Sequence, residues 1–250
     1  MLAGLAGFIA INGVRVSRRR EARRSALALS RDTTIVSAGQ VQGTVRREII
    51  PVGKGQALSP AELRKRVLNL SPGTYINDVL NEQDSALYRW PERLSDALRV
   101  YIEPSSTIAN WDPHYPDLAR TVFDEWSEAG FPLRFTFIYD STSADIRIRW
   151  IDRFGPEEGQ RIGVTDRVQA STFEITKARV AIANHDSAGH PLSPATVGGV
   201  IRHEIGHALG LNHANDRSSV MYRESATSSI GNSDRATLRL LYLVPAGSLK

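Results

Sequence analysis

An uninterrupted run between positions 203 and 213 places three histidines and one glutamate in a spacing suited to binding a metal ion. It reads HEIGHALGLNH, which is the pattern HExxHxxGxxH. His203 and His207 are four residues apart, so on a helix their imidazoles project from one face and can converge on one ion. His213 can reach the same ion only if the chain turns back. Gly210 permits that turn, because glycine adopts left-handed backbone conformations without penalty.

These residue types define a hydrolytic chemistry. Three neutral imidazoles form an open tetrahedral zinc site whose fourth position holds a water molecule. Zinc lowers the pKa of that water, and Glu204 is placed to take the proton because it adjoins the first ligand without being a ligand itself. The pattern therefore predicts His203, His207 and His213 as zinc ligands. It predicts Glu204 as the general base for attack on an acyl carbon, such as that of a peptide bond.

The surrounding sequence predicts the elements that position these residues. Ser193 followed by Pro194 is typical of a helix start, and the helix is expected to continue to about residue 209. An earlier amphipathic helix is predicted over 117–128, a short one after Ser59, and a closing one from Ser233. Alternation of apolar and polar residues indicates strands at 98–102, 133–139, 145–151, 161–165 and 179–184.

A methionine follows the histidine run, in the segment Ser219-Val220-Met221-Tyr222. Together with the histidine run, this segment resembles the metzincin superfamily of zinc endopeptidases, which place a methionine turn beneath the metal. Within that superfamily the chain is most similar to the matrixins. The further similarities are the Met-Tyr pair, the DIxIxW strand at 145–150, the FDEW segment at 123–126, and a closing helix that contains Ser233-Asp234 and Leu241-Tyr242.

The resemblance covers about residues 95–245 and implies an α+β fold. That fold is a twisted mixed five-stranded sheet packed on two long helices, with a small C-terminal subdomain and the zinc cleft between them. Met221 would form the apolar base of the site. Zinc would be the catalytic ion, and calcium binding is left open.

The resemblance to metzincins also implies that substrate binds on an edge strand of this sheet. An extended peptide would pair antiparallel with that edge and place alternate side chains in pockets. The predicted residues are Val180, Ala181, Ile182 and Ala183. An ordinary edge strand without this role is the alternative.

The chain also departs from the matrixin pattern. Ala214 follows the third histidine where serine is usual in vertebrate matrixins, and Arg223 stands where proline often follows Met-Tyr, so the S1′ wall is not predicted. The chain contains no cysteine, which excludes latency through a thiol. His185, Asp186 and His190 lie close together in sequence and could contribute to a second metal site, or they could belong to an ordinary polar loop.

Composition and charge divide the chain. With 41% hydrophobic and 23% charged residues, it is typical of a soluble globular protein. Residues 1–66 hold 13 Lys and Arg against 4 Asp and Glu, whereas the remainder holds 18 against 23. The main domain is therefore mildly acidic, which argues against nucleic-acid binding. We expect three parts, given by residues 1–25, 26–94 and 95–250.

The first of these parts is apolar and then arginine-rich, and its character suggests an anchor or signal-like segment. Its apolar run of about 13 residues is shorter than the roughly 20 that a helix needs to span a bilayer, and its charges follow the run instead of preceding it. Association of the N-terminus with a membrane is left open.

Residues 26–94 are interpreted as a linker or a pro-segment that blocks the cleft, and residues 95–250 as the matrixin-like peptidase domain.

The function predicted is a zinc-dependent endopeptidase that acts on protein or peptide substrates outside the cytoplasm, either secreted or membrane-anchored. The alternative is a catalytically silent, zinc-stabilised module of the same fold that binds a peptide or a surface. A membrane-associated interaction protein that works through residues 1–66 is a third hypothesis. The sequence does not indicate the oligomeric state.

Overall fold

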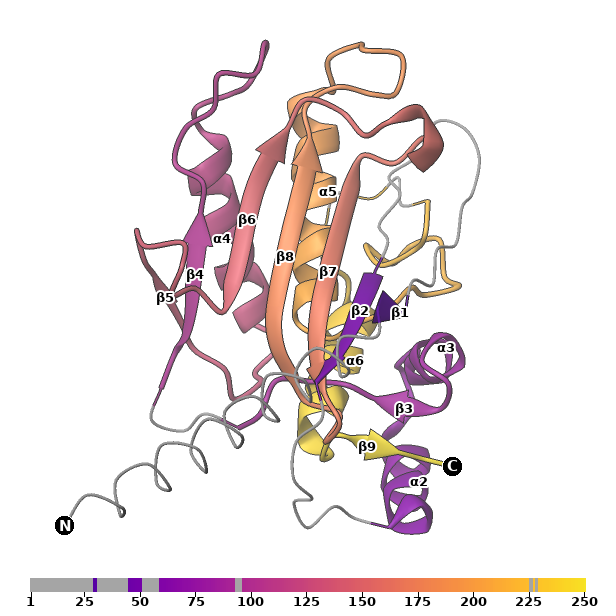
Figure 1. The fold of residues 1–250 in the computed structure, drawn as a ribbon. Helices are drawn as coiled ribbons and strands as arrows, with labels where there is room; N and C mark the ends of the chain where they lie inside the picture. The colour runs from indigo at the N-terminus through magenta and orange to yellow at the C-terminus, as the bar shows by residue number, and fades with distance from the viewer. Residues whose placement is uncertain (1–28, 31–44, 51–58, 93–95, 225–226, 228) are drawn as a thin grey trace, which may run out of the picture.

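The structure of the protein is a computed structural model (Figure 1). The described residues are 29–30, 45–50, 59–92, 96–224, 227 and 229–250. The apolar and arginine-rich segment predicted over 1–25 lies outside them. Within the described part of the chain, no helix combines the length and apolar character that crossing a bilayer requires.

The main sheet of the domain is mixed, with the strand order β1-β2-β7-β8-β6-β4-β5. Its strands are β1 (Leu29–Ser30), β2 (Val45–Ile50), β4 (Leu98–Ile102), β5 (Phe135–Phe137), β6 (Ile146–Ile151), β7 (Gly163–Ala170) and β8 (Ile175–Ala183). The strands from β8 to β5 are parallel, and β7 runs antiparallel to β8. Five of these strands belong to the predicted peptidase domain, as expected. The two strands β1 and β2 come from the N-terminal segment and extend the sheet to seven.

The strand predicted to bind substrate is not an edge strand. Residues Val180–Ala183 lie in β8, which pairs with β6 on one side and with β7 on the other. The backbone groups of β8 are therefore already used by its two neighbours, and all four side chains are buried. The prediction that Val180, Ala181, Ile182 and Ala183 receive a substrate strand is wrong. The sequence pattern identified a strand but could not show which strand ends the sheet.

Two long helices pack on the sheet, as predicted. They are α4 (Tyr115–Ser127) and α5 (Pro194–Ala208). The Ser193 side chain caps α5 by accepting a hydrogen bond from the Thr196 backbone at 3.1 Å. The two helices are joined by the bidentate ion pair of Arg202 with Glu125, with nitrogen–oxygen distances of 2.7 Å. The closing helix α6 (Asn232–Leu243) is also confirmed.

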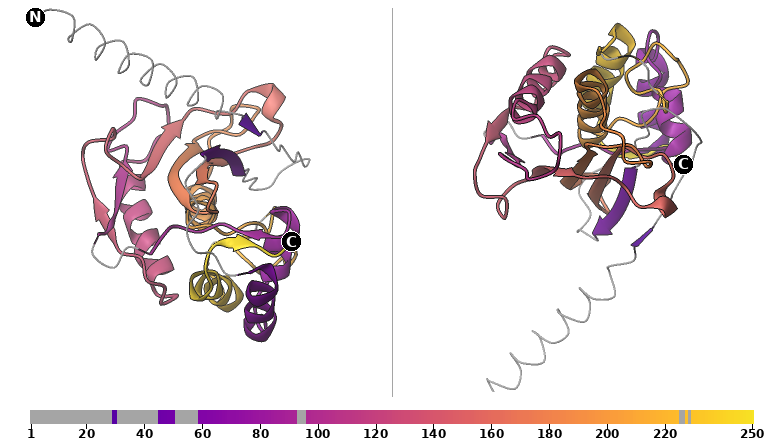
Figure 2. Two further views of the ribbon diagram at one scale, coloured as in Figure 1. Left: turned by 60° about the horizontal axis from the view of Figure 1, so that its bottom comes forward. Right: turned by 90° about the horizontal axis from the view of Figure 1, so that it is seen from above.

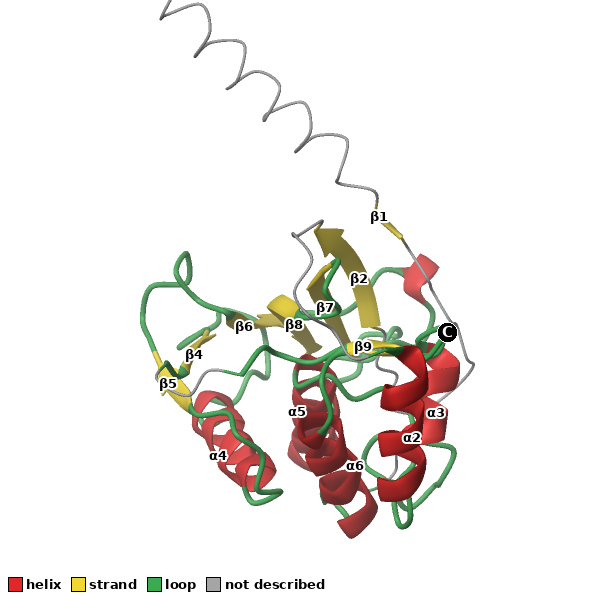
Figure 3. Ribbon diagram, turned by 90° about the horizontal axis from the view of Figure 1, so that it is seen from below, coloured by secondary structure: helices red, strands yellow, loops and turns green. Residues whose placement is uncertain are grey.

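The segment interpreted as a linker contains a folded layer. Its elements are α2 (Pro60–Leu70), α3 (Ile76–Glu82) and β3 (Ala86–Leu87), and β3 pairs with β9 (Gly247–Ser248). Figure 2 shows α2 and α3 beside the C-terminal α6. Because residues such as Leu63, Ile76, Leu87 and Trp90 are at most 1% exposed and join the main core, the linker interpretation is wrong for residues 59–92. The helices α2 to α6 lie on one face of the sheet (Figure 3).

Candidate metal centre

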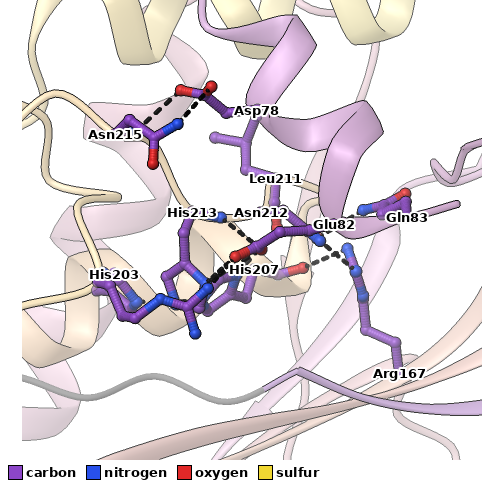
Figure 4. Close-up of polar contacts among 11 residues, drawn as sticks. Asp78, Glu82, Gln83, Arg167, His203, His207, Leu211, Asn212, His213 and Asn215 are labelled. Atoms are coloured by element: carbon purple, nitrogen blue, oxygen red, sulfur yellow. Dashed lines mark hydrogen bonds and ion pairs between the residues drawn. The ribbon is translucent and has the colours of Figure 1, made fainter. Parts of the chain in front are cut away.

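Helix α5 and the turn that follows it bring the three predicted histidines together. His203 and His207 lie on successive turns of α5, and Gly210 has the predicted left-handed backbone, with a φ of 112°. The chain then folds back so that His213 faces the other two rings (Figure 4). One nitrogen from each of the three buried histidines lies within 4.8 Å of the others. This geometry is compatible with one shared ion.

Each ring is held by a hydrogen bond at its Nδ1 atom. His203 Nδ1 lies 2.7 Å from the Val220 carbonyl oxygen, and His207 Nδ1 lies 2.9 Å from the Leu211 carbonyl oxygen. The partner of His213 Nδ1 is a carboxylate, that of Glu82, at 3.0 Å. An Nδ1 atom that donates a proton leaves the Nε2 lone pair free. The Nε2 atoms of His203 and His207 indeed face each other at 3.0 Å.

The electrostatics of the site favour neutral imidazoles. Burial lowers the pKa of His203 to about 3, and burial together with the neighbouring His203 and His213 lowers the pKa of His207 well below its ordinary value. Neutral imidazole is the form that binds a metal. The donor type and outer hydrogen bonds of the three rings, and the neutral state favoured for His203 and His207, therefore fit a zinc ion.

Glu204 is positioned by β7, which runs alongside α5. Its Oε2 atom accepts a hydrogen bond from the Thr165 hydroxyl at 2.7 Å, while its Oε1 atom is buried without a hydrogen-bond partner among the described residues. Gly163 leaves room for this carboxylate, because a Cβ atom there would lie 2.4 Å from Oε1. Burial raises the pKa of Glu204 to about 8 despite the bond from Thr165. A divalent cation nearby would lower that pKa again.

The C-terminal end of α5 is fixed by side chains from three other elements. The Trp90 indole donates to the Ala208 carbonyl and the Tyr242 hydroxyl donates to the Leu209 carbonyl, both at 2.8 Å. Arg167 of β7 donates to the His207 carbonyl at 3.3 Å. The last carbonyls of a helix have no partners within the helix, so these bonds satisfy them and fix where the turn to His213 begins.

The predicted methionine turn lies directly against α5. Met221 is fully buried, and a Cβ atom on Gly206 would come within 2.4 Å of its sulfur atom. The buried Asp234 of α6 anchors this turn by accepting hydrogen bonds from the Ser219 hydroxyl and from the Val220 backbone. Because Val220 is also the residue whose carbonyl holds His203, the turn positions a predicted ligand.

Substituting Gly206 with alanine should therefore disturb the site. Although alanine normally stabilises a helix, here its methyl group would displace Met221, and such overpacking costs about 1–3 kcal/mol. Gly199→Ala is the matched control in the same helix, since its nearest contact would be at an ordinary 3.6 Å. Thermal unfolding should show Gly206→Ala below the parent protein and Gly199→Ala at or above it. Equal melting temperatures for the two variants would contradict this packing argument.

The other residues considered for a metal site, His185, Asp186 and His190, do not form a cluster of three metal-binding side chains. The His185 ring contacts Asp152 at 2.8 Å and Asn110 at 3.2 Å, whereas Asp186 pairs with His190. Within the part of the chain that the structure describes, the only group of three or more metal-binding side chains is the histidine triad. Calcium binding stays a prediction.

Sequence reasoning missed Glu82, which lies in α3, far from the histidine run. Its Oε1 and Oε2 atoms lie 3.0 and 3.1 Å from His213 Nδ1, and Arg223 forms an ion pair with the same carboxylate. Partial burial opposes ionisation, but the hydrogen bond and charge of His213 and the charge of Arg223 lower the pKa of Glu82 to about 2. No local sequence pattern could have indicated a contact between residues 131 positions apart.

The fold, with its buried histidine triad, is of the metzincin type. The matrixin family model matches residues 90–243, which is more than half of the chain, so the chain belongs to the matrixin family. The match includes all three histidines, Glu204 and Met221.

Relatives found by sequence comparison are distant. The chain is 29% identical over 112 residues to metalloendoproteinase 1-MMP of Arabidopsis thaliana, covering 41% of this chain and 30% of that protein. It is 28% identical over 132 residues to a protein of Heliothis virescens ascovirus 3e whose description refers to a matrix metalloproteinase. That match covers 46% of this chain and 27% of the viral protein. The chain thus spans less than a third of the length of either curated relative.

A solved structure described as the GM1-bound form of the ECX AB5 holotoxin is similar at 15% identity and a TM-score of 0.45. The match covers 67% of this chain and 87% of that one.

Proposed function

We propose that this protein is a zinc-dependent endopeptidase. One observation carries the proposal: three buried histidines face one point, and the residue after the first of them is a glutamate with one oxygen that has no hydrogen-bond partner among the described residues. This combination is what hydrolysis at a metal requires, namely three protein ligands that leave one position open for water, and a separate base. Membership of the matrixin family supports the same activity.

The roles of the residues follow from their contacts. A zinc ion held by His203, His207 and His213 would supply Lewis acidity, which makes water more acidic and polarises a carbonyl group. Thr165 fixes one oxygen of Glu204, so the other oxygen remains available to accept a proton from the attacking water. The protonated Glu204 can then pass that proton to the leaving amine. The burial of Glu204 keeps bulk water from competing for the proton.

An extended substrate is best accommodated at β7, the strand that contacts Glu204. Thr165 of β7 touches Glu204 and also pairs with Val45 of β2. The parallel strand β2 therefore occupies the edge that a substrate strand would need. This arrangement supports the interpretation of residues 26–94 as a pro-segment only for the part that precedes residue 59, where the folded layer begins. That part contains β2.

A location outside the cytoplasm, whether secreted or membrane-anchored, is proposed on the family resemblance alone. Contact of the N-terminal segment with a membrane rests only on its arginine cluster. Protein or peptide substrates follow from the peptidase activity proposed.

Removing the metal should abolish cleavage. We expect the purified protein to bind one zinc ion and to cleave casein or a quenched peptide library, to lose that activity on dialysis against a chelator, and to regain it when zinc is added. Zinc content measured by atomic emission should fall and recover in step with the activity. A protein that holds one zinc ion and cleaves nothing in a broad library would contradict the proposal and favour the silent binding module.

A further inference from the structure

The three histidines differ in what holds them. The partners of His203 and His207 are backbone carbonyls that lie within 17 and 4 residues of them in the sequence. His213 is instead held by the side chain of Glu82, from a part of the chain that precedes the matched family region. It is also the only one of the three that lies outside the helix, in the segment after Gly210. His213, the predicted ligand that is not part of a helix, is thus the one whose ring hydrogen-bonds to a carboxylate and not to a backbone carbonyl.

The Glu82 carboxylate is aimed at His213 by several bonds. It accepts from the His213 backbone N–H at 3.2 Å as well as from the ring, so both the chain and the imidazole of that residue are fixed. Arg223, two residues after Met221, forms an ion pair with the same carboxylate. Glu82 therefore joins the third histidine to the end of the methionine turn. Arg223 stands where proline often follows Met-Tyr in matrixins. A proline could not form this ion pair, so the pairing of Arg223 with Glu82 depends on a residue in which the present chain departs from the family pattern.

The rest of α3 is fastened to the same segment. Asp78, one turn before Glu82, accepts from the Asn215 backbone at 2.9 Å and from its side-chain amide at 2.8 Å. Gln83 contacts the Asn212 side chain, which also accepts from Arg167 at 2.9 Å (Figure 4). One short helix thus contacts the residues on both sides of His213. Of these three residues, Glu82 is the one that hydrogen-bonds to the His213 ring.

We propose that Glu82 is a positioning residue for the metal centre, and that α3 is a built-in part of that centre and not a removable pro-segment. A carboxylate on Nδ1 fixes the tautomer with a free Nε2 lone pair, orients the ring and makes it a stronger donor. Loss of such an outer partner costs roughly 10- to 100-fold in metal affinity. The inference rests on the proposed zinc site but not on turnover.

The test compares Glu82→Gln, Glu82→Ala and Asp78→Ala in the full chain. Zinc affinity is measured by competition with a chromogenic chelator, and the ligand field is measured from the visible absorption of the cobalt-substituted protein. The amide of Glu82→Gln still accepts from Nδ1 but carries no charge, so we expect about a tenfold loss of affinity. Glu82→Ala should lose about 100-fold and change the cobalt spectrum.

Asp78→Ala is the matched control, because it removes two hydrogen bonds that dock the same helix without touching a ligand. It should lower the melting temperature yet leave zinc affinity and the cobalt spectrum unchanged. If Asp78→Ala weakens zinc binding as much as Glu82→Ala does, or if Glu82→Ala binds zinc like the parent protein, the positioning role is wrong.

The same data separate this inference from the peptidase proposal. A parent protein that cleaves peptides while Glu82→Ala keeps full zinc affinity overturns the inference and leaves the function standing. A parent protein that cleaves nothing, but whose zinc affinity falls in Glu82→Ala, overturns the function and supports the inference.

Discussion

Glu204→Gln should retain zinc and lose peptide hydrolysis almost completely. The amide has the shape of the carboxylate and can still accept the Thr165 hydrogen bond, so the packing around Gly163 is preserved. It has no basic oxygen, however, and cannot take a proton from the attacking water. Positioned general bases contribute about 10²–10⁴-fold, so kcat/KM should fall by that factor. The measurement is cleavage of a quenched peptide at matched zinc content.

A matched control is available on the neighbouring helix. Glu125→Gln removes a carboxylate that binds Arg202, the residue directly before His203, without reaching the metal centre. Its kcat/KM should stay close to that of the parent protein. If Glu204→Gln binds a full equivalent of zinc and retains more than about a tenth of the activity, another group acts as the base.

The metal centre could be predicted from sequence because its main parts are local. A helix periodicity places His203 and His207, and one glycine accounts for the return of His213. The cap of α5 and the apolar patterns of α4, α5 and α6 are equally local, and these helices occur within a few residues of their predicted bounds. The resemblance to the matrixin family then predicted the mixed five-stranded sheet. The separate C-terminal subdomain stays a prediction.

The parts that could not be predicted depend on contacts between distant segments. The buried strand β8 and an edge strand share the same apolar composition, so Val180–Ala183 were assigned the wrong position in the sheet. Residues 30–60 lack periodicity, yet Val45–Ile50 pair with β7 through backbone groups that any sequence possesses. The role of Glu82 depends on α3 docking against a loop more than a hundred residues away. Tertiary packing, not local propensity, decided each of these outcomes.

Two truncations should have opposite effects, because the N-terminal part of the chain has two physical roles. A chain that begins at Ser59 lacks β2, so the edge of β7 becomes free for a substrate strand. A tethered strand competes at an effective concentration in the mM range, so its removal should raise kcat/KM on the order of tenfold, mainly through KM. Steady-state kinetics on one quenched peptide measure this effect. Equal KM values for the full and shortened chains would show that β2 does not compete with substrate.

A chain that begins at Asp96 should instead fail to fold. It lacks the layer formed by α2, α3 and β3, including the fully buried Ile76, Leu87 and Trp90. Each such side chain contributes about 2–5 kcal/mol, so the combined loss approaches or exceeds the roughly 5–15 kcal/mol by which a domain is stable. It also loses the Glu82 contact to His213 and the indole bond that ends α5. Circular dichroism and zinc content should both show the loss, and a cooperative, zinc-loaded 96–250 fragment would place the domain boundary back near residue 95.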